Sequence, residues 1–96
     1  MDYSRYKDLK IRLLEPGILE IVMGDEASGK LSTAGHRMHA ELAEIWRDVD
    51  RDSEVSVAIL RGAGKGFSAG GDFGLIDDMI KDFDTRARVW REARDL

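Results

Sequence analysis

Six of the ten glycines in this 96-residue chain lie in one short segment, between Gly62 and Gly74. A largely aliphatic run at residues 55–60 precedes this segment, and an apolar pattern of helical spacing follows it. Glycines in a strand-to-helix connection let the backbone approach a ligand closely and expose its amide groups. The segment therefore predicts an α/β fold with a binding site built from backbone amides, and a flexible connecting loop is the alternative.

A β-hairpin is predicted near the N-terminus. Apolar and polar residues alternate over residues 9–13, which is the period of a half-buried strand, and residues 18–23 form a second strand candidate. Pro16 and Gly17 lie between the two runs, where proline presets φ and glycine accepts a positive φ. We therefore expect the two strands to pair through a tight turn.

A long amphipathic helix is predicted over residues 32–50. Its apolar stripe, at spacings of four, three and four, consists of Met38, Leu42, Ile45 and Val49. The hydroxyl of Ser32 is expected to cap the first turn. The hairpin, the helix and the run at residues 55–60 give the order ββαβ, in which the second and third strands can pair in parallel. We expect the third strand to be buried.

Two further helices are predicted after the glycine-rich segment. The first carries Leu75, Ile76, Met79 and Ile80, and the second carries Phe83, Ala87, Trp90 and Ala93. The second pattern alternates arginine with acidic residues and reaches Leu96 without a capping glycine or a proline. We therefore expect a solvated, salt-bridged helix that is still in progress at the last residue.

The composition argues against several classes of protein. The formal net charge is −4 and the basic residues are spread along the chain, so a nucleic-acid partner is not expected. No apolar run approaches the ~20 residues of a membrane-spanning helix, so no membrane partner is expected. Cysteine is absent, which excludes disulfides and thiolate metal sites. Residues 1–10 lack the apolar core of a secretory signal, and a cytoplasmic protein is expected.

Two pairs of polar residues suggest chemistry of their own. His36 and His39 have a spacing compatible with a shared metal ion, but the sequence offers no third ligand. A solvated helix face is therefore preferred, and no metal is expected. Asp77 and Asp78 are adjacent, so their side chains diverge on a helix. We interpret them as partners of the helix dipole in a first turn rather than as a catalytic pair.

Two familiar glycine motifs do not fit the glycine-rich segment. A P-loop requires serine or threonine after Gly64 and Lys65, where Gly66 stands. A dinucleotide-binding fingerprint that starts at Gly62 requires glycine where Phe67 stands. The chemistry of the segment must therefore be sought in a longer pattern.

The complete string at residues 57–72, VAILRGAGKGFSAGGD, closely resembles the signature of the enoyl-CoA hydratase/isomerase, or crotonase, superfamily. That signature is a buried strand, a short glycine-rich turn, Phe, Ser-Ala-Gly, a small residue and Asp. The resemblance extends over roughly residues 6–80. It implies an α/β fold that is the N-terminal part of a crotonase-like ββα spiral: hairpin, long helix, buried strand, glycine-rich loop and helices.

The resemblance also implies a site for an acyl-coenzyme A thioester. In crotonase-like proteins two backbone amides hold the thioester carbonyl and stabilise the oxyanion that forms from it. The N–H of Gly71 corresponds to the first of these donors. The carbonyl of Ala69 corresponds to the group that contacts the adenine of coenzyme A, and Ser68, Gly70 and Asp72 complete the loop.

Lys30 is a weaker candidate for the same site. The family often has Asn-Arg-Pro after the second strand and Asn-Ala before the long helix, where this chain has Met-Gly-Asp at 23–25 and Gly-Lys-Leu at 29–31. Lys30 is a candidate contact for a coenzyme A phosphate, with an exposed structural lysine as the simpler interpretation. Coenzyme A enters only as part of the substrate, and no covalently bound cofactor is expected.

Crotonase-like proteins are usually well over twice as long as this chain. Residues 1–96 are therefore expected to be the N-terminal portion of a single crotonase-like domain, without the second oxyanion amide or the acid–base glutamates, and to be inactive alone. The intact enzyme is expected to be a lyase or isomerase of acyl-CoA or fatty acid metabolism. It would form a homotrimer or hexamer, or a second chain would carry the rest of the domain. The alternative is a non-catalytic binding or assembly module with a crotonase-like N-terminal fold.

Overall fold

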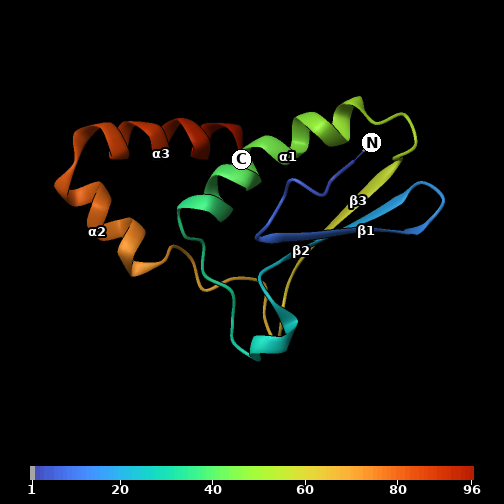
Figure 1. The fold of residues 1–96 in the computed structure, drawn as a ribbon, viewed down its shortest axis with the longest axis horizontal. Helices are drawn as coiled ribbons and strands as arrows, with labels where there is room; N and C mark the ends of the chain where they lie inside the picture. Colours follow the sequence, from blue (N-terminus) through green and yellow to red (C-terminus); the bar gives the residue numbers. More distant parts are fainter. Residues whose placement is uncertain (1) are drawn as a thin grey trace.

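Three strands and three helices make up the fold. The computed structural model describes residues 2–96. The strands are β1 (Leu9–Glu15), β2 (Ile18–Met23) and β3 (Val57–Gly62), and the helices are α1 (His36–Arg51), α2 (Phe73–Lys81) and α3 (Phe83–Asp95), with a short 3-10 turn, η1 (Glu26–Ser28), after β2. Figure 1 shows the sheet on one side of the molecule, α2 and α3 on the other, and α1 between them. This order confirms the predicted α/β architecture.

The sheet has the strand order β1-β2-β3. β1 and β2 pair antiparallel across a turn in which Gly17 has a φ of 88°, so the predicted hairpin is confirmed. β3 pairs in parallel with β2, with Leu60 opposite Ile21, and α1 provides the crossover that parallel pairing requires. The loop that follows β3 consequently lies beside the segment that leads into α1.

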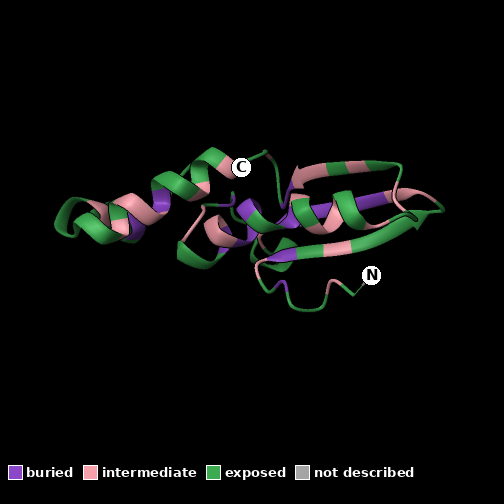
Figure 2. Ribbon diagram, turned by 90° about the horizontal axis from the view of Figure 1, so that it is seen from above, coloured by how far each residue is buried: buried purple, intermediate pink, exposed green. Residues whose placement is uncertain are grey.

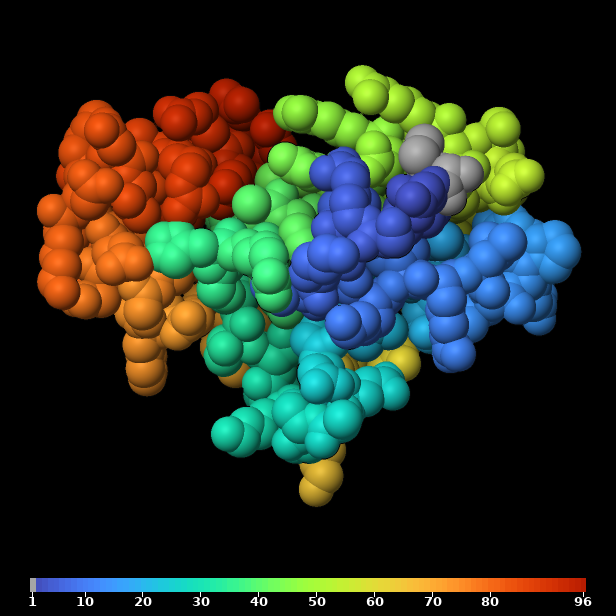
Figure 3. All heavy atoms as spheres, in the orientation of Figure 1, coloured from blue at the N-terminus to red at the C-terminus, as the bar shows by residue number. Residues whose placement is uncertain are grey.

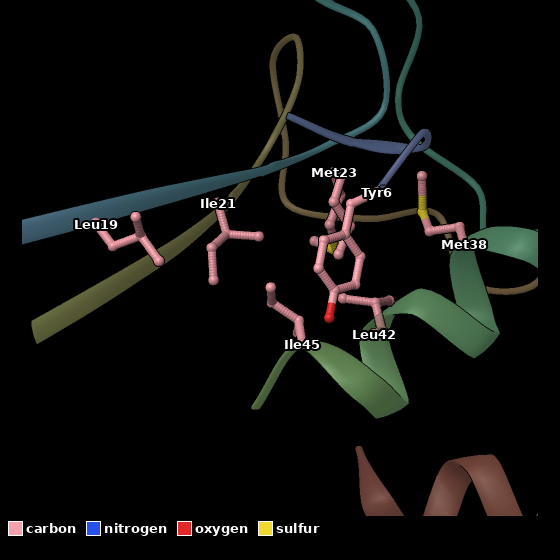
Figure 4. Close-up of a cluster of buried hydrophobic side chains, with 8 residues drawn as sticks. Tyr6, Leu19, Ile21, Met23, Met38, Leu42 and Ile45 are labelled. Carbon is pink, nitrogen blue, oxygen red and sulfur yellow. The ribbon is translucent and has the colours of Figure 1, made fainter. Parts of the chain in front are cut away.

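The core forms between one face of the sheet and α1. Its buried side chains, most of them labelled in Figure 4, are Tyr6, Leu9, Leu19, Ile21, Met23, Met38, Leu42 and Ile45. Ile21 on β2 and Ile45 on α1 are fully buried. Burial of an aliphatic or aromatic side chain of this size contributes roughly 1.5–3 kcal/mol, so the sheet and α1 stabilise each other.

The N-terminal segment is fastened across α1 by polar contacts. The carboxylate of Glu41 accepts hydrogen bonds from the backbone N–H groups of Lys7 and Asp8, both at 2.7 Å. The hydroxyl of Tyr6 donates to Asp48 at 2.5 Å, and burial together with this hydrogen bond raises the pKa of Tyr6. These contacts hold the start of β1 against the helix.

The start of α1 differs from the sequence prediction. The helix begins at His36 rather than at Ser32, and Gly35 occupies the N-cap position without a side-chain hydrogen bond. Ser32 is buried instead, and its hydroxyl donates to the sulfur of Met38 at 3.7 Å. The physical reason is that the backbone of residues 32–34 is bonded to the glycine-rich loop and is therefore not free to form a helical turn.

β3 differs from the prediction in both position and burial. It begins at Val57 because the N–H of Val55 is used in a turn with Asp52. Val57 is 53% exposed and Ile59 is 42% exposed. β3 is an edge strand of the sheet in the described part of the chain, so only one side of it is paired. The prediction of a buried strand is therefore wrong for these 96 residues.

α2 and α3 extend away from the sheet. α3 packs along α1, and α2 packs on α3. Figure 2 shows the two helices projecting beyond the sheet. The molecule measures 45 × 30 × 18 Å, and its radius of gyration of 14.0 Å exceeds the about 12.5 Å typical of a compact chain of this length. No helix within residues 2–96 has the length and apolar character needed to cross a membrane.

Candidate functional site

Two glycines shape the loop between β3 and α2. A Cβ atom on Gly62, at the end of β3, would overlap the backbone carbonyl oxygens of Gly66 and Phe67, so the loop can fold back onto the strand only with glycine at this position. Gly70 has a φ of 89°, in the left-handed region that residues with side chains rarely adopt. The loop then runs beside the segment that precedes α1, as Figure 1 shows below the helix.

A set of three backbone hydrogen bonds, here called the backbone bridge, ties the loop to residues 32–34. The N–H of Ala69 donates to the carbonyl of Ser32 at 2.7 Å. The N–H of Ala34 donates to the carbonyl of Gly70 at 2.8 Å, and the carbonyl of Ala34 accepts from the N–H of Asp72 at 2.9 Å. The loop is therefore held in place by backbone groups on both sides of Gly71.

The N–H of Gly71 lies within the backbone bridge but takes no part in it. The preceding amide, that of Gly70, donates to the Oγ of Ser68 at 3.0 Å, and the following amide belongs to the bridge. Within residues 2–96 the N–H of Gly71 donates to no acceptor, and Gly71 is exposed. Its position is fixed by its neighbours while its own donor is available to a ligand.

Ser68 and Asp72 use their side chains to hold the loop. The Ser68 hydroxyl oxygen accepts from Gly70, as described above, and closes a local turn. The Oδ1 of Asp72 accepts from the N–H of Gly74 at 3.0 Å and caps α2. Both side chains therefore position the backbone around Gly71.

Ala69 and Lys30 lie at the outer edge of the loop. The N–H of Ala69 is used in the backbone bridge, and its carbonyl accepts no hydrogen bond from the described residues. The carbonyl of Lys30 lies 3.1 Å from the position that a Cβ would take on Gly64, which brings the segment after β2 against the loop. The side chain of Lys30 is exposed and forms no ion pair within residues 2–96. Figure 3 shows gold-coloured atoms of the glycine-rich loop at the lower edge of the molecule, beside the teal segment.

One apolar side chain lies beside Gly71. The Cδ1 and Cγ1 atoms of Ile76 lie 3.6 Å from the position that a Cβ would take on Gly71. Phe67 and Phe73, at the two ends of this part of the loop, are both exposed. An amide donor beside apolar groups interacts more strongly with a developing negative charge than one surrounded by water, provided that a ligand or a further part of the protein excludes water.

The sequence alone assigns no chemistry to the pairs His36/His39 and Asp77/Asp78, and three of these four residues contact another helix. The Nδ1 of His39 donates to the carboxylate of Glu92 at 2.7 Å, with both side chains only 14% exposed, so it does not lie on a solvated face. Asp78 lies in the second turn of α2 and contacts His36 at 2.7 Å, whereas Asp77 pairs with Lys81, so neither belongs to a first turn. The spacing of Asp77 and Lys81 is that of an i,i+4 pair within one helix and could have indicated their contact. No sequence signal could have identified the contacts of His36 and His39, because they depend on how α2 and α3 pack against α1.

A hollow of about 790 Å³ lies along β1, away from the glycine-rich loop. Its lining includes Glu20, which accepts hydrogen bonds from Arg12 at 2.9 Å and from Arg61 at 3.1 Å. These two guanidinium groups hold the pKa of Glu20 below its usual value. The carboxylate of Glu20, on β2, thereby links all three strands through Arg12 of β1 and Arg61 of β3. None of residues 62–74 lines the hollow.

Comparison with known proteins identifies relatives over parts of longer chains. No protein-family model matches the sequence. The chain is 36% identical over 59 residues to the 1,2-epoxyphenylacetyl-CoA isomerase of Escherichia coli strain K12, which covers 62% of this chain and 22% of that protein. The curated relative is therefore more than four times as long as the matched segment.

Solved structures match the fold over nearly all of this chain. An enoyl-CoA hydratase/isomerase from Mycobacterium paratuberculosis is 31% identical, with a TM-score of 0.82, over 92% of this chain and 34% of that one. A β-diketone hydrolase from the cyanobacterium Anabaena sp. PCC 7120 is 26% identical, with a TM-score of 0.79, over 97% of this chain and 36% of that one. This chain spans about a third of the structures that it matches.

Proposed function

We propose that this chain, whose fold matches the N-terminal part of crotonase-fold structures, forms the acyl-CoA-binding part of an enzyme of the enoyl-CoA hydratase/isomerase type. The observation that carries the proposal is the free N–H of Gly71, held between two amides that are both hydrogen-bonded. The names of the relatives, an acyl-CoA isomerase and an enoyl-CoA hydratase/isomerase, give the substrate class.

In this proposal Gly71 acts as one donor of an oxyanion hole. The thioester carbonyl oxygen accepts a hydrogen bond from its N–H, and the bond strengthens as negative charge develops on that oxygen in an enolate or a tetrahedral intermediate. The backbone bridge fixes the donor before the substrate arrives, so no reorganisation is needed during the reaction. Loss of one such donor typically lowers the rate about 10²–10³-fold.

The remaining loop residues are assigned to binding of coenzyme A. The carbonyl of Ala69, which accepts no hydrogen bond from the described residues, is available to the amino group of adenine. Ser68, Gly70 and Asp72 hold the loop in the required shape. Lys30, with its unpaired side chain in the described part of the chain, is a weaker candidate for a phosphate contact.

The rest of the active site is assigned to protein outside these 96 residues. A second amide and an acid–base group are needed for hydration or isomerisation, and the chain spans about a third of the structures that it matches. We expect the 96 residues alone to bind acyl-CoA weakly and to show no turnover of an enoyl-CoA. A native mass above 10.8 kDa would identify a longer polypeptide, a homotrimer or hexamer, or a second chain that completes the domain.

The exposed aliphatic side chains of β3 support the second candidate, an assembly module without catalysis. Val57 and Ile59 are the exposed residues on the edge strand, and Phe73 adds to the apolar surface at the start of α2. Such a module would self-associate or bind a partner without responding to acyl-CoA. Sedimentation in the presence and absence of acetyl-CoA separates the two candidates.

The decisive experiment compares acetyl-CoA with S-ethyl-CoA, a thioether that lacks the carbonyl oxygen. We expect this chain to bind the thioether about fivefold more weakly, as the loss of one hydrogen bond predicts. Gly71→Pro removes the N–H and should abolish the difference between the ligands. Gly71→Ala keeps the N–H, and its Cβ would meet Ile76 at an ordinary 3.6 Å, so this matched control should retain the difference. Equal affinities for the two ligands in the unaltered chain would rule out the Gly71 assignment.

A further inference from the structure

His36, the first residue of α1, connects all three helices. Its Nε2 lies 2.7 Å from the Oδ2 of Asp78 on α2, and its Nδ1 lies 2.6 Å from the Nη2 of Arg88 on α3. The Nη1 of Arg88 in turn donates to Glu92 at 2.8 Å, and Glu92 contacts His39. The five side chains form a continuous chain of polar contacts in the order His39, Glu92, Arg88, His36 and Asp78.

The partners of His36 determine where its proton is. A guanidinium group can only donate hydrogen bonds, so the Nδ1 that faces Arg88 must be an unprotonated acceptor. The single proton of a neutral imidazole then lies on Nε2 and is donated to the carboxylate of Asp78. Both contacts are satisfied at once only by a neutral His36 in the Nε2–H form.

The contact of His36 with Asp78 joins the two chain segments that the backbone bridge ties together around Gly71. His36 follows Ala34 of the backbone bridge by two residues, and Asp78 lies on α2, the helix that begins directly after Asp72 of the same bridge. The bridge holds α2 at its N-cap residue, Asp72, and His36 holds the helix again in its second turn. Two attachments on one short helix fix its rotation about its axis, and with it the direction of the Gly71 N–H.

We propose that neutral His36 is a positioning residue for the Gly71 amide, acting by linking Asp78 of α2 to Arg88 of α3. This inference rests on the proposed function of Gly71. The charged groups that face the imidazole are Asp78 from α2 and Arg88 from α3, while the carboxylate of Asp72 lies beside the preceding residue, Gly35. On its own helix, His39 lies one turn further along and contacts Glu92.

Protonation of His36 opposes one of its two contacts. The added proton on Nδ1 points at the donor groups of Arg88, so the acceptor is lost and two positive charges face each other. The contact of Asp78 with Nε2 remains possible, so α2 keeps its link to α1 but loses its link through His36 to α3.

The test uses two substitutions of the full chain and a matched control. His36→Phe removes both contacts and keeps a planar ring, whereas His36→Gln supplies one donor and one acceptor and should restore them. Arg91→Gln changes an exposed arginine of α3 that forms no ion pair within residues 2–96 and should behave like the unaltered chain. We expect His36→Phe to move the Gly71 amide resonance, to leave those of β2 in place, and to weaken acetyl-CoA binding about fivefold.

The imidazole ¹⁵N resonances report the protonated nitrogen directly and do not depend on any substitution. An Nδ1–H form of His36 at neutral pH would overturn the proposal, as would a His36→Phe variant with an unchanged Gly71 resonance. If His36→Phe does not fold, Asp78→Ala removes the contact between His36 and α2 from the side of Asp78. This variant must then give the same shift of the Gly71 resonance. If acetyl-CoA does not bind the unaltered chain, the proposed function fails, but the tautomer and the Gly71 shift still decide whether His36 positions the loop.

Discussion

The molecule has two regions that are stabilised by different forces. The first, here called the body, consists of the sheet and α1. The second consists of the glycine-rich loop, α2 and α3. In the body, side chains such as Ile21 and Ile45 are fully buried. In the second region α2 buries only Leu75, whereas Phe73 is 87% exposed. The loop and the two helices are attached by the backbone bridge and by contacts such as that of His36 with Asp78.

This difference separates a stable frame from a region that holds the candidate site. Apolar burial is not directional and sets most of the stability, whereas hydrogen bonds set the direction in which an amide points. A region with few buried apolar contacts opens at lower free energy than the core. We therefore expect substitutions in the body to change global stability and those in the second region to change mainly local order and binding.

The largest effect is expected from a cavity in the body. Ile45→Ala should lower the free energy of unfolding by about 3 kcal/mol, because Ile45 is fully buried between α1 and the sheet. The matched substitution in the second region, Ile80→Ala, should change it by less than about 0.5 kcal/mol, because Ile80 is 73% exposed. Urea denaturation followed by circular dichroism measures both. Equal losses would show that α2 is packed as tightly as the core and would remove the contrast between the regions.

A smaller effect is expected where the two regions join. Gly62→Ala places a Cβ against the backbone of Phe67 and should cost about 2 kcal/mol, because the loop must move away from β3. Gly71→Ala serves as the control and should be close to neutral, since only the side chain of Ile76 lies near its Cβ. The same denaturation curves test this pair. A neutral Gly62→Ala would mean that the loop is not folded back onto the strand.

The smallest effect is expected at the ion pairs of the sheet, and it depends on pH. Arg12 and Arg61 lower the pKa of Glu20 in the folded chain below its usual value of 4.5. The stabilisation that results is complete above pH 4.5 and is lost as the pH falls through the lower folded value. Glu20→Gln should therefore be less stable than the unaltered chain at neutral pH, and the difference should shrink in acid. A difference that grows below pH 4.5 would contradict the pairing.

The sequence predicts those parts of the fold that depend on short-range patterns. The alternation over residues 9–13 and the turn at Pro16 and Gly17 give the hairpin, and the stripe that contains Leu42 and Ile45 gives the face of α1 that packs on the sheet. Both patterns repeat with the period of the element, so no knowledge of the partner is needed. The crotonase-like architecture follows from the same patterns together with the string at residues 57–72.

The features that depend on distant partners are not predictable in this way. Ser32 looks like a helix cap, but its carbonyl accepts from Ala69, and this contact exists only once the loop has folded back. Val57 is an aliphatic residue of a type that is often buried, but its exposure depends on what covers the edge of the sheet. His36 and His39 have the spacing of a solvated face, yet both contact side chains of α3, and His39 is only 14% exposed. Tertiary contacts override local propensity at all four positions.

The candidate site also has one feature that the sequence predicts and one that it does not. Its location after β3 is predictable, because a glycine-rich strand-to-helix loop is recognisable from the sequence. The backbone bridge is not, because it requires residues 32–34 to run beside residues 69–72. The role of Gly71 as an oxyanion donor stays a prediction, and the unpaired amide of the described loop gives it a specific test.

The most direct test of this role is the response of the Gly71 amide in the ¹⁵N-labelled chain to acetyl-CoA and to free coenzyme A. Both ligands carry the adenine that the proposal places at Ala69, but only acetyl-CoA carries the thioester carbonyl oxygen that the proposal places at Gly71. We expect acetyl-CoA to shift the Gly71 amide resonance and to slow hydrogen exchange at this amide, whereas free coenzyme A should leave the amide unchanged. A Gly71 amide that remains unchanged at saturating acetyl-CoA would contradict the proposed role of Gly71 as a donor to the thioester carbonyl.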